Sequence, residues 1–206
     1  MKKVIALLGV VLFSASAFAL NAVAPADQAC EGKKAAFEKK VASQDNDVFI
    51  VENILINMAD PMAKQSDEQA LEQAICYGTF QVKGQSLVAF VRANAEIFPG
   101  DISGIEAARL RTFADRVERL GVQAQLNKVV AQGNLSYTIQ YILGNFADPM
   151  ANMSDEEAKP LAKIYQGCKV NGQPMVEFTR VHASEFGENV SQDLDAFVER
   201  VEKLAK

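Results

Sequence analysis

The chain has 206 residues, of which 26 are acidic and 21 basic, with one histidine, three cysteines and no tryptophan. The net charge of −5 argues against nucleic acid and anionic lipid as partners, because both attract basic surfaces. The length allows one or two domains with a buried core.

Residues 1–19 have the features of a secretory signal peptide. Lys2 and Lys3 precede an apolar run that ends in Ala17-Phe18-Ala19, a small-x-small cleavage signal. We expect cleavage after Ala19, export to a bacterial periplasm, and no stable membrane insertion, because the run is too short for a span. Without the two lysines the net charge is about −7.

An internal repeat occupies most of the remaining chain. ADPMA occurs at Ala59–Ala63 and at Ala147–Ala151, 88 positions later, and SDE begins three residues after each. At this offset, residues 44–98 align with 132–186 without a gap, and roughly two in five positions are identical. The repeat predicts a duplicated unit.

The predicted organisation follows from these limits. We expect a flexible N-terminal arm at 20–29, a first repeat at 30–120 and a second at 121–206, with the seam at Leu120-Gly121-Val122. The first repeat carries about four additional residues near Pro99–Gly104.

The predicted fold class is all-α, with two tandem, pseudo-equivalent helical bundles of about five helices each. Apolar residues recur at helical spacing, and strand-like alternation is not sustained. Two serine capping boxes, Ser66-x-x-Gln69 and Ser154-x-x-Glu157, each mark a helix start. The clearest predicted ranges are 33–43, 47–58, 103–120 and 190–204, with one helix from each capping box and one after each of Gly84 and Gly172.

The ADPMA segments are interpreted as corners between helices. Asp60 and Asp148 precede prolines, and a residue before proline disfavours the helical conformation. The preceding helix should therefore end near Ala59, and Asp-Pro should open a new short turn. Met62 and Met150 then pack into the core. The alternative is a carboxylate pair for acid–base chemistry, which would not require the prolines.

Soft side chains suggest a copper site as one hypothesis. Thioether and thiol sulfur atoms and imidazole are ligands for Cu(I), although methionines are also ordinary core residues. No dense Met-x-Met or Cys-x-x-Cys string is present. The candidate ligands are Met58, Met62, Met150, Met153, Met175, Cys76, Cys168 and His182.

The three cysteines predict one disulfide in an oxidising compartment, and the sequence allows three pairings. We favour Cys76–Cys168, with Cys30 free, because the two positions fall one turn apart at the end of the third helix of each repeat. Such a bond would join the repeats.

Paired residues of the two repeats are candidates for binding. Arg92 and Arg180 could each clamp a carboxylate or a phosphate, or pair with an acid on a neighbouring helix. The aromatic residues could line a ligand cleft or form the core. These aromatic candidates are Tyr77, Tyr165, Phe90 and Phe178.

These features favour a non-catalytic helical binding protein of the bacterial envelope, of the adaptor, chaperone or immunity type. Its partner would be another envelope or secreted protein. The first alternative is a periplasmic carrier of a small apolar ligand in an inter-helix or inter-repeat cleft, and the second is copper binding through Met and Cys. We expect no cofactor and no enzymatic activity, because no catalytic constellation can be assembled from the sequence.

Overall fold

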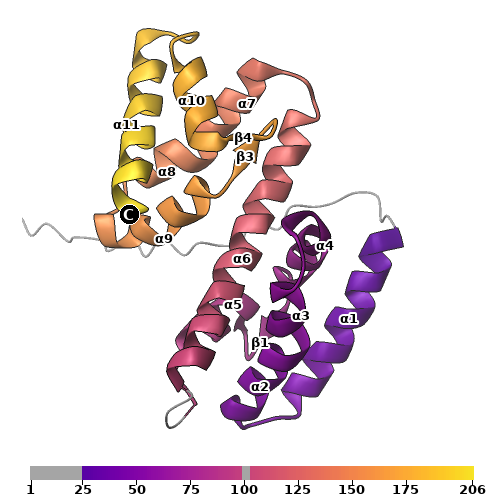
Figure 1. Ribbon diagram of the computed structural model, residues 1–206. Helices are drawn as coiled ribbons and strands as arrows, with labels where there is room; N and C mark the ends of the chain where they lie inside the picture. Colours follow the sequence, from indigo (N-terminus) through magenta and orange to yellow (C-terminus); the bar gives the residue numbers. More distant parts are fainter. Residues whose placement is uncertain (1–24, 99–102) are drawn as a thin grey trace, which may run out of the picture.

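A computed structural model describes residues 25–98 and 103–206 (Figure 1). The chain is mostly helical in these ranges, which confirms the all-α class. The expected signal peptide, its cleavage site and residues 20–24 of the expected arm lie outside the described residues. Residues 25–29 of the expected arm belong to the first helix, which begins at Pro25. Proline suits a first helical turn, since its missing N–H would have no partner there.

The elements follow one another in the following chain order. They are α1 (Pro25–Ala42), α2 (Asp47–Ile54), η1 (Leu55–Ala59), α3 (Asp60–Ala63), α4 (Asp67–Tyr77), β1 (Gln81–Val82), β2 (Gln85–Ser86), α5 (Leu87–Ala93), α6 (Ser103–Val130), α7 (Leu135–Ile142), η2 (Leu143–Ala147), α8 (Asp148–Ala151), α9 (Asp155–Gln166), β3 (Lys169–Val170), β4 (Gln173–Pro174), α10 (Met175–Ala183) and α11 (Glu188–Leu204).

The buried apolar side chains form two clusters along the long helix α6. The first core contains buried residues from Phe37 to Leu120, and the second core contains buried residues from Leu126 to Leu204. Figure 1 shows α1–α5 gathered along one half of α6 and α7–α11 along the other. The N-terminal part of α6 thus belongs to the first core, and its C-terminal part belongs to the second.

The predicted end of a helix at Leu120 was wrong, because α6 continues without a break to Val130. Gly121 at the expected seam lies inside the helix. A glycine inside a helix costs only about 1 kcal/mol relative to alanine, and the apolar residues on both sides are anchored in the two cores.

The predicted corner at ADPMA was also wrong in its position. Asp60 has helical dihedral angles (φ −64°, ψ −45°), and the chain stays helical through α2, η1 and α3. The turn η1 is π-helical, with the N–H of Asp60 donating to the carbonyl of Leu55. The wider turn accommodates Pro61, which would otherwise clash with the carbonyl four residues earlier. Residues 143–151 repeat this arrangement in η2 and α8.

Asparagine side chains accompany both π-helical turns. The Asn57 amide donates to the carbonyl of Asn53, and the Asn145 amide donates to the carbonyl of Tyr141. Each bond supplies a partner for a carbonyl four residues earlier, at a point where the α-helical ladder is interrupted.

The chain turns its corner after Ala63, and an arginine of α6, the last helix of the first core, stabilises this corner. Arg116 of α6 donates to the carbonyls of Met62 and Gln65 and forms an ion pair with Asp67. The predicted capping box at Ser66 opens α4, and the one at Ser154 opens α9. Met62 and Met150 are buried as expected.

The second core has the same kind of corner. Arg200 of α11 donates to the carbonyls of Met150 and Met153 and pairs with Asp155. Each arginine therefore donates to one carbonyl, that of Gln65 or Met153, that accepts no backbone N–H among the described residues, and it also neutralises the acid that opens the following helix.

Two short antiparallel hairpins precede α5 and α10. Their turns are Lys83-Gly84 and Asn171-Gly172, and all four residues have positive φ. Two consecutive positive φ angles are typical of the type I′ turn, which matches the twist of a hairpin.

A cationic cleft as the candidate functional site

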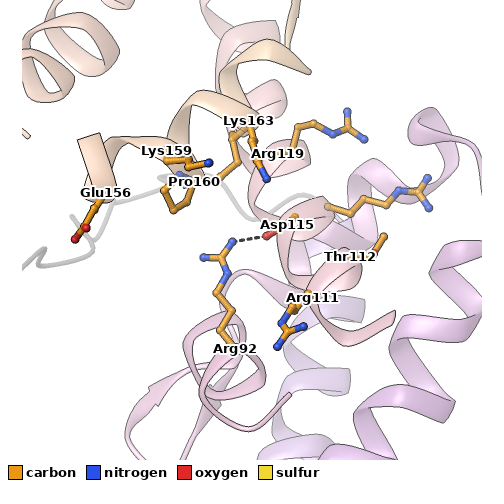
Figure 2. A pocket seen from close by; sticks show the side chains of 11 residues that line it. Arg92, Arg111, Thr112, Asp115, Arg119, Glu156, Lys159, Pro160 and Lys163 are labelled. Atoms are coloured by element: carbon orange, nitrogen blue, oxygen red, sulfur yellow. Dashed lines mark hydrogen bonds and ion pairs between the residues drawn. The ribbon is translucent and has the colours of Figure 1, made fainter. Parts of the chain in front are cut away.

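The largest cleft in the described structure lies between α9 and the wall formed by α5 and α6, where the two cores meet (Figure 2). Its volume is about 760 Å³. Helical spacing builds both walls, because residues three or four positions apart share a face. The lining residues are Arg92 of α5, Arg111, Thr112, Asp115, Arg116 and Arg119 of α6, and Glu156, Lys159, Pro160, Lys163 and Ile164 of α9.

The lining is strongly basic although the chain as a whole is acidic. Four arginines and two lysines line the cleft with two carboxylates, a net of four positive charges among the lining residues of a chain whose net charge is −5. The partner acids Glu118, Asp67 and Glu96 beside the cleft reduce this excess. A concave surface of one sign concentrates the local field and attracts the opposite charge.

Most of the arginines already have acidic partners. The Nη2 atom of Arg92 lies 2.7 Å from Asp115 Oδ1 and 2.7 Å from Glu118 Oε2, both on α6. Arg119 pairs with Asp67 at 2.8 Å, and Arg111 pairs with Glu96. Arg116 forms its hydrogen bonds and its ion pair with the corner after Ala63. These arginines therefore serve partly as structural bridges.

Lys159 and Lys163 differ from the arginines. Within the described residues, neither ammonium group has a carboxylate at ion-pair distance. They lie one helical turn apart on α9, and Figure 2 shows them on the wall opposite Arg92 and Arg111. The cleft thus presents two cations that no internal acid neutralises.

The ion pairs at the cleft alter the acidity of their members. Burial acts to lower the pKa of Arg92, but Glu118 and Asp115 outweigh it and raise that pKa, so the guanidinium stays charged. Burial acts to raise the pKa of Asp67, but Arg119 and Arg116 together hold it below its usual value. Both groups are fully ionised at neutral pH.

Of the two predicted arginine sites, only Arg92 lines this cleft. Arg180 forms ion pairs with Glu177 and with Glu202 of α11. Both arginines therefore pair with an acid on a neighbouring helix, α6 for Arg92 and α11 for Arg180.

The four aromatic candidates pack inside the cores. Phe90, Phe178 and Tyr165 are buried, and Tyr77 is half-buried against Phe80. Burial raises the pKa of Tyr165 to about 12. None of these four lines the described cavities, so the structure does not bring them together into an apolar ligand site.

The soft-ligand candidates are divided between the two cores. Met58 and Met62 lie in the first core, whereas Met150 and Met175 lie in the second, with Met153 packed against it. His182 instead contacts Glu185 through Nδ1 at 2.6 Å, and its ring lies tilted against that of Phe178. The described ranges contain no group of three or more His, Cys, Asp or Glu side chains placed to hold a metal ion.

The predicted disulfide was wrong. Cys30 of α1 is bonded to Cys76 at the end of α4, and Cys168 is the free cysteine. The corner after Ala63 brings the end of α4 beside α1, whereas Cys168 is buried in the second core. Its thiol donates to the carbonyl of Ile164, and burial raises its pKa to about 12, so it is not a nucleophilic thiolate at neutral pH.

Sequence reasoning missed most of the cleft. Of its lining residues it had singled out Arg92 as a binding candidate, but not Lys159, Lys163, Arg111 or Arg119. A weak signal was available, since Lys159 and Lys163 are four residues apart and therefore place two like charges on one helical face. Only the packing of α9 beside α6 places them opposite the arginines.

Comparisons of the chain with protein-family models, with curated proteins and with solved structures found no match. Among the described residues, no helix is both long enough and apolar enough to span a bilayer.

Proposed function

We propose that this protein is an exported, non-catalytic binding protein of the bacterial envelope, and that it holds another envelope or secreted protein in the cationic cleft. The observation that supports the proposal best is the excess of positive charge in the largest cleft of an acidic chain, with Lys159 and Lys163 unpaired within the described residues. Carriage of an apolar ligand is less well supported, because the aromatic candidates pack in the cores.

The test is affinity capture from an envelope extract of the source cells. The wild-type chain should retain one partner in stoichiometric amount, and the double variant Lys159→Glu/Lys163→Glu should lose it. The matched control is Lys33→Glu/Lys39→Glu on α1, which changes the net charge equally at two exposed lysines outside the cleft. Retention of no partner, or equal retention by both variants, would contradict the proposal.

We propose also that the chain consists of two tandem repeats, at 30–120 and 121–206. Two observations support this. The order helix, π-helical turn, helix, helix, hairpin, helix occurs in α2–α5 and again in α7–α10. The buried residues also divide into two cores near Leu120. A fragment covering 103–206 should then unfold cooperatively by itself, as followed by circular dichroism, and a fragment without cooperative unfolding would argue for one indivisible unit.

A further inference from the structure

We infer that the segment of the partner that enters the cleft is acidic and carries at least two carboxylates, which contact Lys159 and Lys163. This inference rests on the proposed function and adds the chemistry of the partner. It depends on three features of the cleft. These are the two lysines without an acidic partner, the weakly held Asp115 beside the unused donors of Arg92, and the shape of the cleft.

The charge of the cleft favours carboxylates at α9. Lys159 and Lys163 are four residues apart on one helical face, so their ammonium groups repel each other. Glu156 lies on the same face but is not at ion-pair distance from either lysine. An incoming carboxylate at each ammonium group removes this repulsion and adds an attraction.

On the opposite wall of the cleft, Arg92 has hydrogen-bond donors that remain available to a ligand. Arg92 contacts Asp115 and Glu118 through Nη2 alone, so Nε and Nη1 have no partner among the described residues. Asp115 is the more weakly held of the two acids, because 61% of its side chain is exposed, against 35% for Glu118. A partner carboxylate can therefore bind Arg92 beside Asp115 or in its place.

The shape of the cleft suits a chain segment better than a small anion. Its lining donors are side chains on two separate walls, whereas a site for a compact anion usually presents converging backbone N–H groups. Pro160 and Ile164 supply apolar surface between the charges. Such a surface can contact the aliphatic parts of acidic side chains while their carboxylates reach the lysines.

The test is fluorescence anisotropy of a fluorescein-labelled deca-glutamate peptide with the full chain at low salt. The wild-type chain should bind it, and the affinity should fall as salt is added, because exposed charges are screened. Lys159→Glu/Lys163→Glu should weaken binding by about tenfold or more, and Lys159→Gln/Lys163→Gln by about threefold. Asp115→Asn should strengthen binding by about two- to threefold, because it leaves Arg92 with one acid fewer.

The Lys33→Glu/Lys39→Glu variant should bind the peptide as the wild type does. Equal binding by the Lys159/Lys163 and Lys33/Lys39 variants would overturn the inference, as would equal binding of a deca-lysine peptide. Displacement by inorganic pyrophosphate at lower concentration than by unlabelled peptide would assign the cleft to small phosphorylated anions instead. A further outcome is that the chain captures a partner independently of Lys159 and Lys163 and does not bind the peptide. The protein would then still be a binding protein, but its cleft would not bind an acidic segment.

Discussion

The first and second cores attach their opening helices in different ways. In the first core, α1 is a separate helix that is linked to α4 by the Cys30–Cys76 disulfide. In the second core, the corresponding place is taken by the C-terminal part of α6, which buries Leu126 there. The opening helix of the second core is thus held by the continuous main chain of α6, whereas the opening helix of the first core is held by a disulfide.

The two opening helices nevertheless make a similar polar contact. Glu38 of α1 accepts a hydrogen bond from the backbone N–H of Gln81 in β1. Gln123 of α6 exchanges two hydrogen bonds with the backbone of Lys169, the residue 88 positions after Gln81. Among the α1 side chains whose burial is described, Phe37 and Val41 are the buried ones, so α1 depends more on its cross-link than the long α6 does. The comparison shows that one packing arrangement tolerates two kinds of attachment.

A second difference lies at the ADPMA segments. In the first core, Asp60 pairs with Arg109 of α6 beside a pocket of about 200 Å³. In the second core, Asp148 and Asp193 line a pocket of about 390 Å³, and no described cation lies at ion-pair distance from Asp148. The helical path is the same in both, so this surface ion pair is not what holds the segment in shape.

Loss of the disulfide should have the largest effect and should be confined to the first core. Cys30→Ala/Cys76→Ala opens a cross-link between residues 46 positions apart, which should lower the free energy of unfolding by about 2–4 kcal/mol. Hydrogen exchange followed by mass spectrometry should show faster exchange in α1 and α4 and little change in α7–α11. Equal acceleration in both cores would mean that they unfold as one unit.

Removal of the corner arginines should affect both cores alike. Arg116→Ala leaves the Gln65 carbonyl without a donor and Arg200→Ala leaves the Met153 carbonyl without one, so each should cost about 1–3 kcal/mol in denaturant unfolding. Arg111→Ala is the control, since Arg111 is exposed and its one ion-pair partner among the described residues is exposed Glu96, and it should cost less than about 0.5 kcal/mol. A near-zero effect at only one of the two corners would break the equivalence.

Acid should weaken the corner at Asp67. Because its pKa in the folded chain lies below the unfolded value near 3.8, Asp67 stabilises the fold above about pH 4, and this contribution is lost as the pH falls through the folded pKa. Asp67→Asn should therefore reduce stability at neutral pH by about 1 kcal/mol or less, since water screens this partly exposed pair.

The difference between wild type and Asp67→Asn should shrink below pH 4 in thermal unfolding followed by circular dichroism. Asp155→Asn should show the same sign, because the pKa of Asp155 is lowered by Lys203 and Arg200, against the opposing effect of burial. A difference that grows towards low pH would show that the sign is wrong.

The smallest effect is expected at the ADPMA surface. Asp193→Arg places a cation beside Asp148, as Arg109 lies beside Asp60 in the first core. The variant should stabilise the chain by about 0.5 kcal/mol. Asp195→Arg makes the same charge change at an exposed neighbouring position of α11 and serves as the control. Equal gains from the two variants would attribute the effect to net charge and not to Asp148.

Local signals explain which parts of the fold could be predicted. The serine capping boxes and the burial of Met62 and Met150 follow from residues close together in the chain. The Asn171-Gly172 dipeptide is also a strong hairpin signal, and the hairpin precedes the helix predicted after Gly172. The π-helical turn could not be predicted, because Asp-Pro normally marks a helix boundary and only the surrounding packing keeps this helix continuous.

The sequence by itself determined the helical character of the chain, its internal similarity at an offset of 88 residues and the helix starts at Ser66 and Ser154, because these depend on periodicity and on hydrogen bonds between near neighbours. Tertiary structure alone decided the Cys30–Cys76 pairing, the continuity of α6 and the cleft that sets Lys159 and Lys163 opposite Arg92. Each of these joins residues far apart in sequence through the angle at which two helices pack, and that angle is set by the side chains of both helices together.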